Sequence, residues 1–114
     1  MNDELSALFK ELKKEYIESL PKKFTILQNL LNDKNYIGLE EEFHKYKGSG
    51  KTYGLPEVTL VCEIGEKLAL REPTDEESIN DVVELFSQIK LAYTEGRTID
   101  LSTHPLYLKL IKKA

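Results

Sequence analysis

The chain has 114 residues, which suffice for one domain with a single apolar core and exclude two domains of ordinary size. Its 16 basic and 20 acidic residues give a net charge of −4 and are interleaved, which excludes the basic patch typical of nucleic-acid-binding proteins. The single cysteine, Cys62, excludes an internal disulfide. Because no apolar run approaches the roughly 18 residues of a membrane span, we expect a cytoplasmic protein without a membrane anchor.

Amphipathic helices are predicted along nearly the whole chain, because apolar residues recur every three to four positions and no segment alternates as a strand does. The first helix is expected from about Asn2 to Ser19. Its apolar face consists of Leu5, Leu8, Phe9, Leu12 and Tyr16. Pro21 is expected to break or kink this helix, because proline lacks an amide donor and clashes with the preceding turn. A second helix is therefore expected over residues 21–33.

The third helix, from about Tyr36 to Tyr53, carries an inward-facing seam at alternating spacings of four and three. The seam consists of Leu39, Phe43, Tyr46, Gly50 and Tyr53. Gly54 is expected to end this helix, and Pro56 suits the first turn of the next one.

Two further helices follow, over about 56–71 and from a Thr74–Glu77 capping box to Gly96. The expected buried residues of the fourth helix are Val58, Val61, Cys62, Gly65, Leu68 and Ala69. Those of the fifth are Ile79, Val82, Val83, Phe86, Ile89 and Tyr93. In the tail, over 97–114, a short helix is expected from about Pro105 to Lys112, and His104 is expected to be a capping or surface residue.

The predicted fold is therefore all-α. Short connections force helices of similar length to run antiparallel, so we expect an up-and-down four-helix bundle with an additional N-terminal helix and a short C-terminal helical tail. The chain has no repeat, low-complexity segment or linker-like composition, and we treat residues 1–114 as a single domain.

The most informative segment lies between Glu42 and Pro56. It contains a histidine, an aromatic residue, Lys-Gly-Ser-Gly, and then an aromatic residue and Gly. These positions are His44, Tyr46, Lys47, Gly48, Ser49, Gly50, Tyr53 and Gly54. The segment closely resembles the motif of the histidine-containing phosphotransfer (HPt) family, without a gap, and the resemblance extends over about residues 5–93.

This resemblance implies that His44 accepts a phosphoryl group from a receiver-domain aspartate or a kinase and passes it to another receiver, as one step of a two-component phosphorelay. The expected partners are receivers of response regulators or hybrid histidine kinases, and the receiver supplies the magnesium. The protein itself would be a monomeric phosphocarrier without a kinase or ATP-binding domain, cofactor or metal of its own.

Helical geometry independently places His44, Lys47, Gly48 and Lys51 on one stripe away from the apolar seam, at about 100° per residue. Glycine inside a helix costs about 0.5–1 kcal/mol relative to alanine, so Gly48 requires a reason. Close approach of a partner and a phosphoryl group to the imidazole supplies one, and close helix packing is the structural alternative. Lys47 is expected to place an ammonium donor near the phosphoryl oxygens.

Four further residues near the histidine are expected to contact the partner: Glu40, Glu41, Lys45 and Lys51. Glu40 and Glu41 lie one turn before His44, where their charge repels phosphate and favours the protonated imidazole. They therefore either weaken phosphorylation or select a partner with a basic rim.

Two other functions compete with phosphotransfer. Gly48-Ser49-Gly50-Lys51-Thr52 resembles the end of a nucleotide-binding P-loop, but that motif requires Gly where Lys45 stands, and also a preceding strand. The second alternative is a helical adaptor of the same fold that signals by binding alone.

Overall fold

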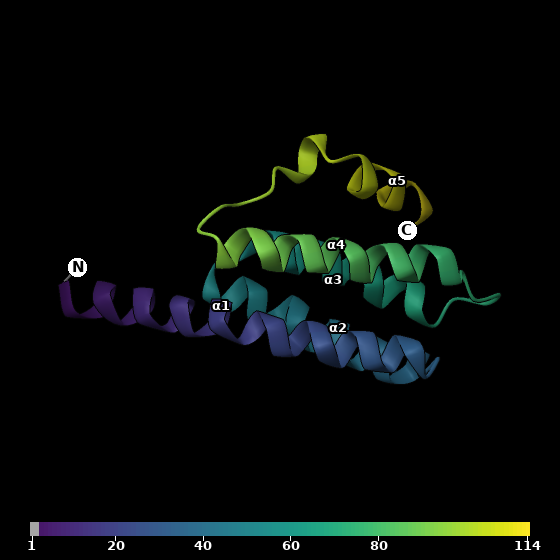
Figure 1. Ribbon diagram of the computed structural model, residues 1–114, viewed down its shortest axis with the longest axis horizontal. Coiled ribbons are helices and arrows are strands. Elements are labelled where there is room, and N and C mark those ends of the chain that lie inside the picture. The colour runs from purple at the N-terminus through teal and green to yellow at the C-terminus, as the bar shows by residue number, and fades with distance from the viewer. Residues whose placement is uncertain (1–2) are drawn as a thin grey trace.

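The structure is a computed structural model that describes residues 3–114. It contains five α-helices and one short 3-10 helix, η1. They are α1 (Asp3–Asn32), α2 (Tyr36–Tyr53), α3 (Pro56–Ala69), α4 (Glu76–Thr94), η1 (Leu101–Thr103) and α5 (Pro105–Lys113). Helices α1 to α4 form an up-and-down bundle, and α5 lies against its outside (Figure 1). The described residues contain no strand, so the predicted all-α class is confirmed.

The predicted break at Pro21 is wrong, because α1 continues through the proline. Leu20 and Leu27 are fully buried on either side of it, so packing holds both halves of the helix on the core. The additional N-terminal helix is thus the first part of α1, and its expected start at Asn2 lies outside the described residues. The first turns extend beyond the end of the bundle (Figure 1).

This extension explains why only part of the expected apolar face of α1 is buried. Tyr16 is buried and Leu12 is half-buried, whereas Leu8 and Phe9 are 53% and 57% exposed. No side chain of residues 3–15 is buried, and we call this segment the overhang.

Helices α2 and α3 pack antiparallel at unusually close range. A Cβ atom added to Gly50 would lie 2.8 Å from Thr59 Oγ1, and one added to Gly65 would lie 2.7 Å from the ring of Phe43. The Thr59 hydroxyl donates to the carbonyl of Lys47 at 2.9 Å. These contacts fix the rotation of α2, because Phe43 cannot turn without leaving its place over Gly65.

The ends of α2 agree with the prediction, since the helix spans Tyr36–Tyr53. Gly54 follows it with φ +81°, a left-handed conformation that favours glycine, and its amide donates to the carbonyl of Gly50. Pro56 stands in the first turn of α3, as expected.

The predicted capping box at α4 is wrong in one respect, because the N-cap is Asp75 and not Thr74. The Asp75 carboxylate accepts hydrogen bonds from the Ser78 amide at 3.1 Å and from the Ser78 hydroxyl at 2.7 Å. Asp and Thr are both good N-cap residues. Asp75 is favoured because its carboxylate accepts from both the amide and the hydroxyl of Ser78, which is buried. The bonds from the Ser78 hydroxyl and amide hold the pKa of Asp75 below its ordinary value.

We expect Asp75→Ala to lower the free energy of unfolding by about 1 kcal/mol near neutral pH, because a helix donor loses its acceptor. A depressed carboxylate pKa stabilises the fold above the unfolded pKa of about 3.9, and this contribution is lost as pH falls through the lower folded pKa. Urea unfolding across this range should therefore show the difference shrinking in acid. Asp75→Asn, which caps without titrating, is the control, and a pH-independent loss in the alanine variant would contradict the assignment.

The tail packs on α4 and α3 through α5. His104 caps α5: its Nδ1 accepts from the Leu106 amide at 3.2 Å, and its Nε2 lies 2.8 Å from Gln88 Oε1. This agrees with the expected capping role, whereas η1 was not predicted.

Cys62 is fully buried, and burial raises the pKa of its thiol, so the residue is part of the core and unreactive. No helix among residues 3–114 has the length and apolar character to cross a membrane.

Candidate functional site

His44 stands on the outer surface of α2 with its side chain 65% exposed. The two residues that anchor this part of the helix, Phe43 and Tyr46, are 0% and 4% exposed in the core. Because both neighbours are fixed by packing, the imidazole is presented to solvent from a rigid element and not from a loop.

A carboxylate on α3 connects the histidine with the lysine of the motif. Glu66 Oε1 lies 2.7 Å from His44 Nδ1, and Glu66 Oε2 lies 2.6 Å from Lys47 Nζ. Both oxygens of one carboxylate are thus engaged, and the three side chains form a connected group between α2 and α3.

The charges in this group stabilise one another. The hydrogen bond from Lys47, followed by that from His44, holds the pKa of Glu66 below its ordinary value despite partial burial. Glu66 in turn raises the pKa of Lys47. Near neutral pH the group therefore contains a carboxylate and an ammonium.

An ionised carboxylate only accepts hydrogen bonds, so the hydrogen between Glu66 and His44 belongs to Nδ1 of the imidazole. In the neutral ring this leaves the lone pair on Nε2, the nitrogen without a protein partner among the described residues.

We expect nitrogen NMR of the neutral imidazole to show the hydrogen of His44 on Nδ1. Glu66→Ala should lose this preference, because neither ring nitrogen then has a fixed acceptor. Glu66→Gln is the matched control, since its side-chain carbonyl still accepts from Nδ1. An unchanged tautomer in the alanine variant would show that Glu66 does not set it.

Gly48 leaves open space beside the imidazole. A Cβ atom built on this residue meets nothing within 4 Å, unlike one built on Gly50 or Gly65. Close helix packing therefore accounts for Gly50 and Gly65 but not for Gly48.

The other predicted contact residues lie around this centre in different ways. Lys51 continues the stripe one turn beyond Gly48. The ammonium of Lys45 pairs with Glu42 at 2.6 Å, so its charge is compensated within the protein. Glu41 is exposed and Glu40 is half-buried, one turn before His44. The structure thus groups His44, Lys47 and Gly48 and leaves the other four at the margins.

Glu66 is the residue that the sequence analysis missed. It follows Gly65 in α3. For this helix the sequence analysis predicted the buried residues and assigned no role to the charged ones. Because only Gly54 and Leu55 separate α2 from α3, the antiparallel register places residue 66 opposite residue 44. That register is the signal by which Glu66 could have been found.

The comparison with protein families decides the class of the protein. The family model of the Hpt domain matches residues 11–96. The chain belongs to the Hpt domain family. Neither the curated proteins nor the solved structures gave a significant match.

Hpt domains carry phosphoryl groups in two-component phosphorelays, interact with receiver domains and have no kinase activity of their own. The match covers the overhang only from Glu11 onwards, so its exposed Leu8 and Phe9 precede the matched segment. Residues 3–114 contain no group of three or more His, Cys, Asp or Glu side chains arranged to hold a metal ion.

Proposed function

We propose that this Hpt domain acts in the cytoplasm as a phosphocarrier, with Nε2 of His44 as the nitrogen that accepts the phosphoryl group from a receiver aspartate or a kinase and returns it to another receiver. The observation that carries the proposal is the exposed imidazole with its Nδ1 on Glu66 and open helix surface at Gly48 beside it.

In the proposed step, the Nε2 lone pair attacks the phosphorus of the receiver's aspartyl phosphate. The N–P bond forms as the P–O bond to the aspartate breaks, and the aspartate leaves as a carboxylate. Nε2 carries no proton, so no base is needed to remove one. The receiver holds the magnesium that neutralises the phosphoryl oxygens, and this protein uses no cofactor.

Glu66 and Lys47 have separate roles in this step. Phosphorylation of a ring that already carries a hydrogen on Nδ1 makes the imidazole cationic, and the Glu66 carboxylate at 2.7 Å stabilises that charge. Lys47 donates one hydrogen to Glu66, and an ammonium has two more for the phosphoryl oxygens. Lys47 is thus a catalytic residue, whereas Glu66 is a positioning residue that acts through the ring and the lysine.

The geometry gives no support to nucleotide binding. The segment Gly48–Thr52 lies inside α2, where its amides take part in the helix, and Gly50 is buried against α3. A P-loop requires free amides in a loop that follows a strand. A purely adaptor function leaves the open surface at Gly48 without a purpose.

The test is transfer to the purified protein from receiver domains charged with radioactive acetyl phosphate and magnesium. We expect label that is stable in alkali and labile in acid, as befits phosphohistidine, and that returns to a fresh receiver. Absence of label with every receiver of the source organism would contradict the proposal.

A further inference from the structure

We propose that the overhang is a second docking surface for the receiver that exchanges phosphate with His44, and that it takes an apolar side chain flanked by carboxylates. This inference rests on the proposed function and adds a partner contact outside the motif.

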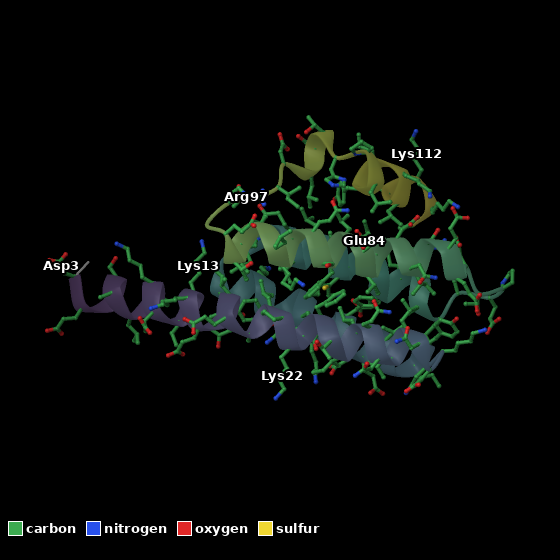
Figure 2. The ribbon with its side chains drawn as sticks, viewed as in Figure 1. Asp3, Lys13, Lys22, Glu84, Arg97 and Lys112 are labelled. Atoms are coloured by element: carbon green, nitrogen blue, oxygen red, sulfur yellow. The ribbon has the colours of Figure 1, made fainter. Side chains whose placement is uncertain are left out.

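The overhang exposes large apolar side chains where the core cannot cover them. Leu8 and Phe9 are 53% and 57% exposed, whereas every large apolar side chain of α1 from Tyr16 onwards is buried or half-buried. Figure 2 shows Asp3 at the far tip of this segment and Lys13 near the point where the bundle begins. Contiguous exposed apolar residues of this kind mark contact surfaces.

Phe9 forms one wall of a pocket between the overhang and the C-terminal end of α2. Tyr53 lines the same pocket, and its ring stacks on buried Tyr16 at a centroid distance of 5.1 Å. The Tyr53 wall of the pocket is therefore held in place by the core, which gives an incoming apolar side chain a fixed aromatic surface.

The charge around this pocket selects the partner. Lys10, Lys13 and Lys51 line it, no carboxylate does, and none of the three forms an ion pair among the described residues. Three uncompensated ammonium groups around an aromatic wall fit an apolar anchor flanked by Asp or Glu. They disfavour the same basic surface of a second copy.

The pocket adjoins the stripe of His44, Lys47 and Gly48 on α2, and this continuity identifies the partner as the receiver. Lys51 belongs both to the pocket and to the stripe of His44, seven residues away along α2. At 1.5 Å per residue this separation is about 10 Å. A domain of about 100 residues has a radius of gyration of about 13 Å, so a receiver seated over His44 also reaches Lys51 at the edge of the pocket.

The experiment uses the receiver domain of the source organism that takes phosphate fastest from the phosphorylated wild-type protein. Transfer rates are measured across receiver concentrations for Phe9→Asp, Lys13→Glu and the control Leu91→Asp. Leu91 is 51% exposed on α4, which lies diagonally opposite α2 and lines no part of the pocket, so the control makes the same kind of change outside both sites. Labelling of His44 by phosphoramidate, a donor too small to contact the overhang, is measured in parallel.

We expect Phe9→Asp to raise the KM for the receiver about tenfold or more, with the saturating rate and phosphoramidate labelling unchanged. Lys13→Glu should raise the KM about fivefold and weaken its salt dependence. Leu91→Asp should leave the KM, the saturating rate and phosphoramidate labelling at the wild-type level.

Three results would overturn the docking surface. The first is a wild-type KM in Phe9→Asp. The second is a loss of saturating rate and phosphoramidate labelling together, which indicates a structural role. The third is a wild-type dimer in sedimentation that Phe9→Asp dissociates without changing the KM, which assigns the face to a second copy. If phosphoramidate and receivers both fail to label wild-type His44, the proposed function fails and the docking surface with it.

Discussion

His44→Gln is expected to accept no phosphate from a charged receiver while it keeps the helix content and melting temperature of the wild type. Glutamine has no ring nitrogen to form the N–P bond, so transfer should fall below detection. The imidazole is 65% exposed and its only described side-chain bond joins it to Glu66 at the surface. We therefore expect the free energy of unfolding to change by no more than about 0.5 kcal/mol.

The second histidine provides the matched control. His104→Gln removes an imidazole from the N-cap of α5, whereas the motif lies on α2. This variant should still be labelled like the wild type. Autoradiography after transfer, with thermal melts of both variants, makes the comparison. Label on His44→Gln that disappears in the double variant would move the acceptor to His104.

The sequence predicted α2 to the residue because local and tertiary signals coincide there. The seam from Leu39 to Gly50 is buried as expected, and Gly54 and Pro56 end and start helices through their own backbone preferences. The positions of His44, Lys47 and Gly48 follow from this one helix, since their relative orientation is set by its period.

The prediction failed where packing overrode a local preference. Pro21 predicts a helix break by its local preference. Leu20 and Leu27 are nevertheless buried in the same core, and the helix loses only one amide donor at the proline. The free energy gained by burying these side chains exceeds the free energy lost at the proline. A prediction from local sequence preferences does not include the burial term. The exposure of Leu8 and Phe9 has the same origin, because an apolar face predicts burial only where other helices reach it.

Glu66 could not be found from the motif because its role depends on the register of two helices. Within α3 it is a charged residue among apolar ones, and only the antiparallel pairing with α2 gives it His44 and Lys47 as partners. The way these two helices pair depends on the packing contacts at Gly50 and Gly65, which a single-helix pattern does not specify.

Gly48→Gln tests whether the glycine exists for access. If a receiver and the phosphoryl group approach across the bare helix surface, a glutamine side chain there should slow transfer from a charged receiver by about a hundredfold, since small displacements of reacting groups cost that much. A Cβ at this position meets nothing within 4 Å, so the fold has no reason to suffer. Replacing glycine by a better helix former at an exposed site should leave stability unchanged or raise it by up to about 1 kcal/mol.

Gly50→Ala in the same helix separates access from packing. Its Cβ would lie 2.8 Å from Thr59 Oγ1 and 3.1 Å from the Thr59 amide nitrogen, so α2 and α3 would have to move apart and the melting temperature should fall. Transfer rates and thermal melts of both variants therefore form one experiment. A Gly48→Gln protein that melts lower, as Gly50→Ala should, would assign Gly48 to packing. One that is slow in transfer yet as stable as the wild type shows that the glycine keeps the path to His44 open at the expense of helix stability.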